Sequence, residues 1–205
     1  MSMPVFVAAG AKANATTGTA VVALPAGLSN GDIVILVAET VSAGSVSITA
    51  NGSIGTWNAV SGSPITVTGG EKLYVWWGRW SSGATGPTLQ AGSDHFCAGT
   101  VGYTGVILND SEVINVAGTG TETTVDNSFS FATGLSTTRI NCMCICVASI
   151  LRDSNTASVP VMSDANLASL ASRLRPGGSV YVDDAPPPIP ACPGSHRSRS
   201  WPRTA

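Results

Sequence analysis

The sequence predicts an all-β protein, an antiparallel β-sandwich of jelly-roll type with an extended C-terminal tail. The first indication is Ile33–Ala38, a run that is apolar throughout and follows Asn30-Gly31-Asp32. The second is that apolar or alternating segments recur roughly every 10 to 15 residues, with Gly-containing turns between them. The third is that no amphipathic helical window occurs before Ser163. These patterns are typical of stacked sheets.

Composition divides the chain into two parts. Its 205 residues suffice for one well-filled domain, or for one domain with an appendage. Seven of the twelve prolines and half of the ten Lys and Arg residues follow Leu170. Residues 183–205 show no periodicity, as expected of an extended segment. We therefore predict a β-sandwich domain over residues 1–175 and a Pro/Arg-rich extended tail over 176–205.

The surface is predicted to carry little charge. Charged residues make up 11% of the chain, against about a quarter in ordinary soluble domains. A weakly charged surface is poorly protected against association, so we expect a homo-oligomer packed beside other subunits. The net charge of −2 gives no electrostatic reason to bind nucleic acid or an anionic membrane. We expect neither membrane insertion nor an export signal.

Five segments of the N-terminal part have the β-branched content or the alternation of strands. They are Val5–Ala9, Thr19–Leu24, Ile33–Ala38, Val46–Ala50 and Trp57–Val60. The fully apolar Ile33–Ala38 is expected to be a strand that is covered on both faces. The alternating Val46–Ala50 is expected to be half-exposed, and the pair Asn51-Gly52 after it favours a tight turn.

Glu71–Trp80 is the most aromatic part of the chain. Side chains alternate between the two faces of a strand, which predicts Leu73, Val75 and Trp77 on one face and Lys72, Tyr74 and Trp76 on the other. A glycine inside a strand marks a bend or a bulge. We therefore expect such an irregularity at Gly78.

Three later segments complete the predicted fold. His95–Leu108 is the second long apolar strand and the best partner for Ile33–Ala38. Ile140–Leu151 is long enough for a helix, but its Val, Ile and Cys content favours a third buried strand. We expect these three apolar segments to lie side by side. Ser163–Leu174 fits either a short helix, with its leucines on one face, or an edge strand.

The cysteines do not form a disulfide framework, because their number is odd and three are crowded together as Cys142, Cys144 and Cys146. On a strand, alternate Cα atoms are roughly 6.6 to 7 Å apart. That spacing disfavours a disulfide between neighbours, and a zinc site needs its ligands drawn together around a turn. We expect free thiols that act as small buried apolar groups. No metal or cofactor is predicted.

Aromatic side chains form the main candidate binding surface. Tyr74, Trp76 and Trp80, with Trp57 upstream, are candidates for stacking on sugar rings or for an interface between subunits. If Glu71–Trp80 is a strand, half of its aromatic side chains must face inward. Burial in a core or an interface is the commoner outcome for such residues.

Candidate catalytic groups are few. His95 lies beside Asp94, with Ser93 and Cys97 close in sequence, but catalytic triads are assembled from separate segments. The Gly-rich stretch 118–121 has no Lys and opens no helix, so it is not a phosphate-binding loop. We expect no enzymatic activity and assign no catalytic residue.

The tail is a candidate docking arm. Pro186, Pro187 and Pro188 favour an extended chain that loses little entropy on binding. Arg197, Arg199 and Trp201 follow and supply charge and apolar surface. Contact with nucleic acid is the alternative for this short basic end. A solvated tail or an arm along another chain is favoured.

The succession LPAGLSNGDIVILVAE, EKLYVWWGRW, HFCAGTVGYTGVI and TTRINCMCICVASILRD resembles small β-sandwich virion proteins of tailed bacteriophages, found in tails, fibres and capsid attachments. The resemblance covers about residues 5–160. It includes a "paG...GD" motif before an apolar strand, an aromatic strand, a Gly/Tyr-containing strand at residues 99–106 and a turn at Arg152-Asp153. These motifs are structural, and they carry no catalytic residues.

This resemblance implies a structural subunit of a virion, made in the host cytoplasm. It would act in particle assembly or host attachment, as a trimer if it belongs to a fibre, with other virion proteins as partners. A carbohydrate-binding adsorption module that recognises a host-surface glycan is the alternative. The chain departs from the family pattern after Arg152-Asp153. The closing strands come either from residues 159–162 and 179–182 or from a neighbouring subunit.

Overall fold

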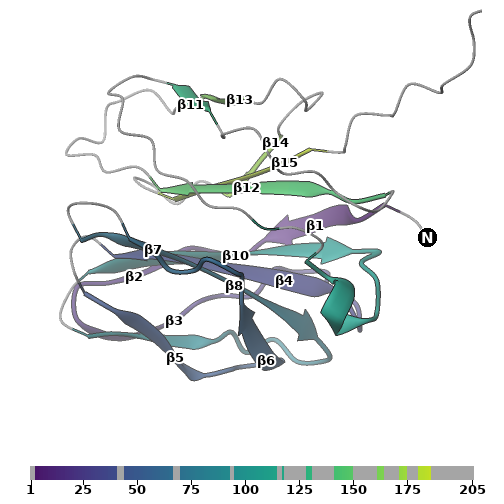
Figure 1. The fold of residues 1–205 in the computed structure, drawn as a ribbon. Coiled ribbons are helices and arrows are strands. Elements are labelled where there is room, and N and C mark those ends of the chain that lie inside the picture. Colours follow the sequence, from purple (N-terminus) through teal and green to yellow (C-terminus); the bar gives the residue numbers. More distant parts are fainter. Residues whose placement is uncertain are drawn as a thin grey trace, which may run out of the picture.

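The computed structural model shows an all-β chain whose strands form stacked sheets (Figure 1), which confirms the all-β part of the prediction. The described residues are 3–40, 44–66, 70–92, 95–114, 117, 128–130, 141–149, 161–163, 171–174 and 180–185, with side chains up to 117 and over 141–147. Within these ranges the only helix is η1 (Asp110–Glu112), a single 3-10 turn. Strand pairs are antiparallel except for one, described below.

The central sheet has seven strands. Five of them lie in the order β1 (Val5–Ala9), β10 (Phe96–Thr104), β4 (Ile33–Thr40), β8 (Lys72–Trp80) and β6 (Ile54–Ala59). Two short strands extend it: β2 (Ala13–Ala15) pairs with β10, and β7 (Ile65–Thr66) pairs with β8. Every residue of β4 is buried. The two-sided cover of β4 and its pairing with β10 are therefore as predicted.

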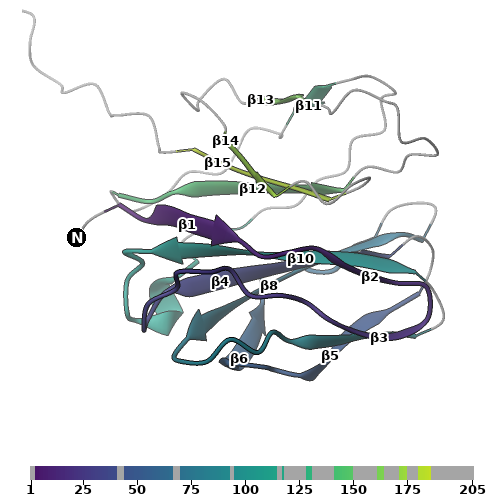
Figure 2. The ribbon, with the colours of Figure 1, turned by 180° about the vertical axis from the view of Figure 1, so that it is seen from behind.

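A second sheet covers one face of the central sheet (Figures 1 and 2). Its order is β3 (Gly18–Val21), β9 (Thr88–Ala91) and β5 (Val46–Ala50). Leu36 of β4 packs in the same core cluster as Leu89 of β9 and Phe96 of β10. β3 ends earlier than the predicted Leu24. The N–H group of Val22 still donates to the carbonyl of Pro87 at 2.9 Å, but Pro87 has no N–H group to return the bond, so the ladder stops there.

A third sheet covers the opposite face, in the order β12 (Cys144–Ser149), β15 (Val180–Ala185) and β14 (Ala171–Leu174). Ile145 and Val147 of β12 pack on a core cluster that contains Ile35 of β4 and Val101 of β10. The prediction that the three apolar segments lie side by side is therefore wrong for β12. An apolar strand can be buried by facing another sheet as well as by pairing within it.

The C-terminal strands bear on two segments whose structure the sequence left open. Residues 171–174 form β14 at the edge of the third sheet, so the edge-strand alternative holds there, and residues 164–170 lie outside the described ranges. β15 pairs with both β12 and β14. Strand pairing therefore continues past residue 175, where composition placed the start of the tail. Of the two predicted closing segments, 179–182 overlaps β15 of the third sheet, whereas 159–162 overlaps β13, which pairs with β11 instead.

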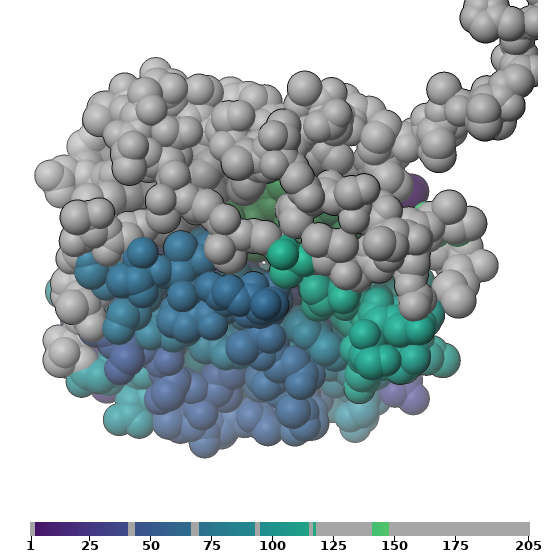
Figure 3. Space-filling view, in the orientation of Figure 1, coloured from purple at the N-terminus to yellow at the C-terminus, as the bar shows by residue number. Residues whose placement is uncertain are grey.

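A parallel pair, β11 (Ser128–Ser130) and β13 (Val161–Ser163), lies beyond the third sheet in both ribbon views. Figure 3 shows the N-terminal part of the chain, which forms the first two sheets, packed into one continuous body. The candidate site is lined by residues of β5, β6 and β8.

Candidate functional site

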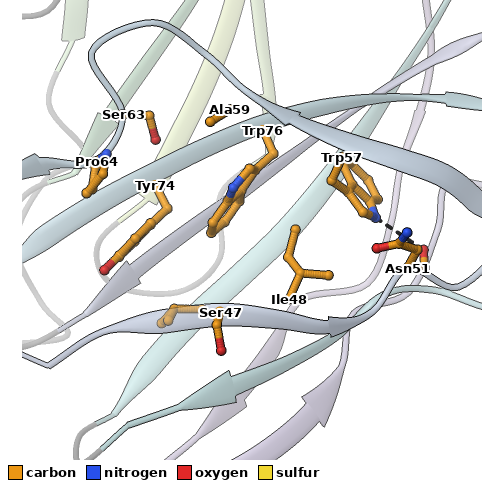
Figure 4. Close-up of a pocket in the computed structure, with 10 residues that line it drawn as sticks. Ser47, Ile48, Asn51, Trp57, Ala59, Ser63, Pro64, Tyr74 and Trp76 are labelled. Atoms are coloured by element: carbon orange, nitrogen blue, oxygen red, sulfur yellow. Dashed lines mark hydrogen bonds between the residues drawn. The ribbon is translucent and has the colours of Figure 1, made fainter.

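A groove of about 450 Å³ lies between the edge of the central sheet and the edge of the second sheet (Figure 4). In the described part of the chain, β6 is the last strand of the first sheet on this side and β5 the last strand of the second. We call this site the aromatic groove. It is lined by Val46, Ser47, Ile48, Asn51, Trp57, Ala59, Ser63, Pro64, Tyr74 and Trp76.

Two of its rings come from alternate positions of β8. Tyr74 and Trp76 point to the face covered by the second sheet, as their spacing predicts. Their ring centroids are 5.2 Å apart and the ring planes are inclined by 12°, so the two rings are stacked. Only 8% of Tyr74 is exposed, whereas Trp76 is half-buried. Tyr74 therefore supports the indole of Trp76, which borders the groove.

The third ring, Trp57, is placed by an irregularity in the neighbouring strand. The β6–β8 register shifts between Ile54 and Trp57, which brings Trp57 opposite Gly78. The pairing of β8 with β4 stays regular through Gly78. The predicted irregularity therefore lies in β6, and the missing side chain at Gly78 makes room for it. Trp57 is held by its indole N–H group, which donates to the backbone carbonyl of Asn51 at 3.1 Å.

The hydrogen bonds of the indole groups distinguish Trp76 from its neighbours. Trp80 donates its indole N–H to the carbonyl of Gly83 at 2.9 Å, and Trp57 is bound to Asn51. Within the described ranges the structure shows no hydrogen bond from the indole N–H of Trp76, nor from the hydroxyl of Tyr74. These two groups are left to bond with water or a ligand, whereas the side chain of Ser47 points away from the rings (Figure 4).

Figure 4 shows the rings in a row, with Trp76 between Tyr74 and Trp57 and with Ile48 facing the gap between the two indoles. The far end is organised by Asn51, whose side-chain amide donates to the carbonyl of Gly55 at 2.9 Å. No charged side chain is among the residues that line the groove. The groove therefore offers flat apolar faces and neutral hydrogen-bonding groups.

The structure brings together part of the predicted aromatic surface. Tyr74 and Trp76 line the groove, but Trp80 does not. Ile48 and Asn51 were missed because they enter the groove only through the approach of β5 to β8, which no local pattern encodes. The docking residues Pro186, Pro187, Pro188, Arg197, Arg199 and Trp201 lie outside the described ranges.

A second cavity, of about 500 Å³, lies at the start of β10. Glu39, His95 and Cys97 are on its wall. Burial raises the pKa of the Cys97 thiol above its ordinary value; the charge of Glu39 raises it further, and Lys12 opposes these effects. A thiol in this state is a weak nucleophile at neutral pH. Ser93 and Asp94, the other members of the predicted cluster, are outside the described ranges.

The crowded cysteines of β12 share one side of the strand. The Sγ atoms of Cys144 and Cys146 are 3.9 Å apart, with Cys146 buried and Cys144 half-buried. Cys97, Cys142, Cys144 and Cys146 are free thiols, whereas Cys192 lies outside the described ranges. No cluster of three or more His, Cys, Asp or Glu side chains suited to a metal ion occurs among the described residues.

In the described ranges, no helix has the length and apolar character required to cross a bilayer. The chain matches no protein-family model, no curated protein and no solved structure.

Proposed function

We propose that the protein is a non-enzymatic structural subunit of a bacteriophage virion, either a tail-fibre component or a component of the head or tail surface. In this proposal it is made in the host cytoplasm and acts in particle assembly or host attachment. It works as a homo-oligomer, with a trimer favoured, and contacts other virion proteins. It needs no cofactor, no metal and no nucleic acid.

The strand order of the first two sheets is the observation that carries this proposal. In a jelly roll of eight strands, one sheet has the order first-eighth-third-sixth and the other second-seventh-fourth-fifth. When β1 and β2 are counted as the first strand, the orders β1-β10-β4-β8 and β3-β9-β5 fit this scheme. β6 holds the fifth place but pairs with β8 instead of β5. Jelly rolls are frequent in viral capsid proteins and in lectins.

Two properties of the chain support a role in an assembly. Charged residues are 11% of the sequence, so charge repulsion between copies is weak. The aromatic groove also carries no carboxylate and no pair of nucleophile and base among its lining residues, which favours binding over catalysis at this site.

The C-terminal residues are proposed to form an extended tail that docks on another chain. Pro186, Pro187 and Pro188 directly follow β15, so an arm would leave the third sheet at Ala185. Proline-rich segments are already extended and lose little entropy when they bind. Arg197, Arg199 and Trp201 would supply the contacts.

The test is whether the protein is present in particles. Virions from the strain that encodes the chain would be purified by density gradient and analysed by quantitative mass spectrometry and immunogold electron microscopy. We expect the protein to band with infectious particles at a constant copy number and to be labelled at one location. Recovery only in the soluble fraction of the lysate would overturn the proposal.

A second candidate function, a carbohydrate-binding adsorption module, is favoured by the aromatic groove. Trp57, Tyr74 and Trp76 are gathered in one concave site beside neutral polar groups, an arrangement suited to hydroxyl-rich rings. A glycan array probed with the full chain and with Trp76→Ala tests this function. Equal signals from the two proteins would contradict it.

A further inference from the structure

We infer that the aromatic groove binds a neutral saccharide, with one sugar ring stacked on the face of Trp76 that looks toward Trp57. This inference rests on the carbohydrate-binding function proposed above and adds the class of sugar and the residue that holds it.

The lack of charge in the groove selects the class of ligand. Its ten lining residues include no Asp, Glu, Lys, Arg or His. A sialic acid, a uronic acid or a phosphorylated sugar would bring an anion into a site with no cation to pair with it, and the lost hydration would be uncompensated. An amino sugar with a free ammonium group would meet no carboxylate. A neutral sugar carries neither cost.

The arrangement of the rings selects the position. Tyr74 stacks on one face of Trp76 with a centroid separation of 5.2 Å, so that face is already covered. The other face looks across the gap toward Trp57, with Ile48 beside the gap (Figure 4). The negative face of an aromatic ring attracts the weakly positive C–H groups of a sugar ring. Because Tyr74 holds the indole in place, little side-chain freedom is lost on binding.

The hydrogen-bonding groups explain why a hydroxyl-rich ligand fits better than a purely apolar one. The indole N–H of Trp76 is a donor, and the hydroxyl of Tyr74 is both a donor and an acceptor. Both residues line the groove. An apolar ligand would cover these groups without replacing their bonds to water, which costs free energy. Sugar hydroxyls can replace those bonds.

The volume agrees with a short oligosaccharide. The groove encloses about 450 Å³, within the range of about 300–1,000 Å³ typical of small-molecule sites. It is a partly open depression and not an enclosed cavity. A chain of sugar rings can therefore continue beyond the site.

The experiment is a titration of the full chain, followed by tryptophan fluorescence and by saturation-transfer NMR. One panel holds neutral oligosaccharides of glucose, galactose and N-acetylglucosamine, and the other holds sialylated and uronic acid-containing oligosaccharides. Trp76→Ala is the test variant. Trp80→Ala is the matched control, because Trp80 lies on the same strand but outside the lining of the groove. Near-UV circular dichroism checks that both variants are folded.

We expect at least one neutral oligosaccharide to bind, with an affinity that falls tenfold or more in Trp76→Ala and stays within twofold in Trp80→Ala. Because no ion pair is involved, salt should not change the affinity. Trp76-dependent binding of acidic sugars alone would overturn the sugar class but leave the carbohydrate-binding function intact. Binding that is insensitive to Trp76 would overturn the position. If no sugar of either panel binds, the carbohydrate-binding function itself fails. Trp76→Phe provides a second test if Trp76→Ala does not fold. It keeps one aromatic ring but loses the N–H donor and part of the stacking surface, so binding of the neutral oligosaccharide should weaken; unchanged binding would overturn the position.

Discussion

Trp57 stands opposite Gly78 in the β6–β8 ladder, and its Cε3 atom lies 3.3 Å from the place where a Cβ atom at position 78 would be. The absence of a side chain at Gly78 thus sets the position of one wall of the aromatic groove. The same space is bordered by Ile54 and by the carbonyl oxygen of Thr56.

We predict that Gly78→Ala destabilises the protein by about 1–3 kcal/mol, as overpacking of a core does. The added methyl group would collide with Cγ2 of Ile54 and lie 2.7 Å from the carbonyl oxygen of Thr56. Urea unfolding measures the loss. Gly55→Ala in β6 is the control, because a Cβ atom there meets nothing within 4 Å, and we expect a change below about 0.5 kcal/mol. Equal stability of the two variants would contradict this account.

The guanidinium group of Arg79 connects the turn before β4 with the segment that follows β10. It donates to the carbonyl of Gly31 at 2.6 Å and to that of Ile107 at 2.9 Å. Its ion pair with Asp110, at 2.7 Å, is different in kind, because the Asp110 side chain is 64% exposed. Solvent screens such a pair.

We therefore predict unequal effects at the two ends of this ion pair. Asp110→Asn should cost less than about 1 kcal/mol, because the pair is exposed. Arg79→Lys should cost about 1–3 kcal/mol, because one ammonium group cannot reproduce the fork that reaches two carbonyls. Urea unfolding of each variant measures these costs. An equal loss for both would show that the ion pair, and not the carbonyl contacts, stabilises this junction.

Cys97 predicts a pH dependence of stability. Its pKa in the folded state is raised above 9.0, first by burial and then by Glu39. The contribution of the protonated thiol is therefore complete below the unfolded-state pKa and is lost as the pH rises through the higher folded-state value. We expect the free energy of unfolding to fall more steeply above about pH 9 in the native chain than in Cys97→Ser. Parallel profiles would contradict the assignment.

The reactivity of Cys97 gives an independent measurement. Because Glu39 raises the pKa of this thiol and Lys12 lowers it, Glu39→Gln should speed alkylation at a given alkaline pH and Lys12→Ala should slow it. Peptide mass spectrometry after timed alkylation follows Cys97 alone. If both variants change the rate in the same direction, altered access to the cavity is the cause instead of charge.

Truncation after Ala185 separates folding from docking. This variant keeps every strand that the structure describes, because β15 ends at Ala185. We expect an unchanged unfolding midpoint and a weaker incorporation into particles, because the proposed arm is removed. Arg197→Ala/Arg199→Ala in the full chain is the milder companion variant and should give a smaller loss. Unchanged incorporation of the truncated chain would refute the docking role.

The hydrophobic pattern within single segments was sufficient to predict the burial of some strands and the limits of others. The uninterrupted apolar run of β4 requires cover on both faces, and the alternation of β8 sorts Trp77 and Tyr74 onto opposite faces; both predictions are confirmed. The limits of β1 and β5 were also predicted correctly. In each case the periodicity of one segment contains the information.

Features that depend on two distant segments were not predictable in the same way. The apolar content of β12 requires burial, but it does not say whether the strand pairs beside β10 or faces it from another sheet. Trp57 reaches the groove through a register shift between β6 and β8. β6 starts at Ile54, three residues before the predicted Trp57, because Ile54 pairs with Trp80 of β8. Trp80 is four residues after Trp76 on β8, so alternation places it on the same face. Its indole N–H group is nevertheless bonded to the carbonyl of Gly83, and Trp80 does not line the groove.

The position of β15 at the middle of the third sheet has a consequence for biosynthesis. β12 and β14 flank it, so on a translating ribosome this sheet must wait until residues 180–185 have emerged, whereas the partners of the first two sheets are all present by Thr104. During that interval the side of β4 and β10 that carries Ile35 and Val101 lacks its final cover. The nascent chain would then expose a hydrophobic surface to which chaperones or other copies of the chain can bind.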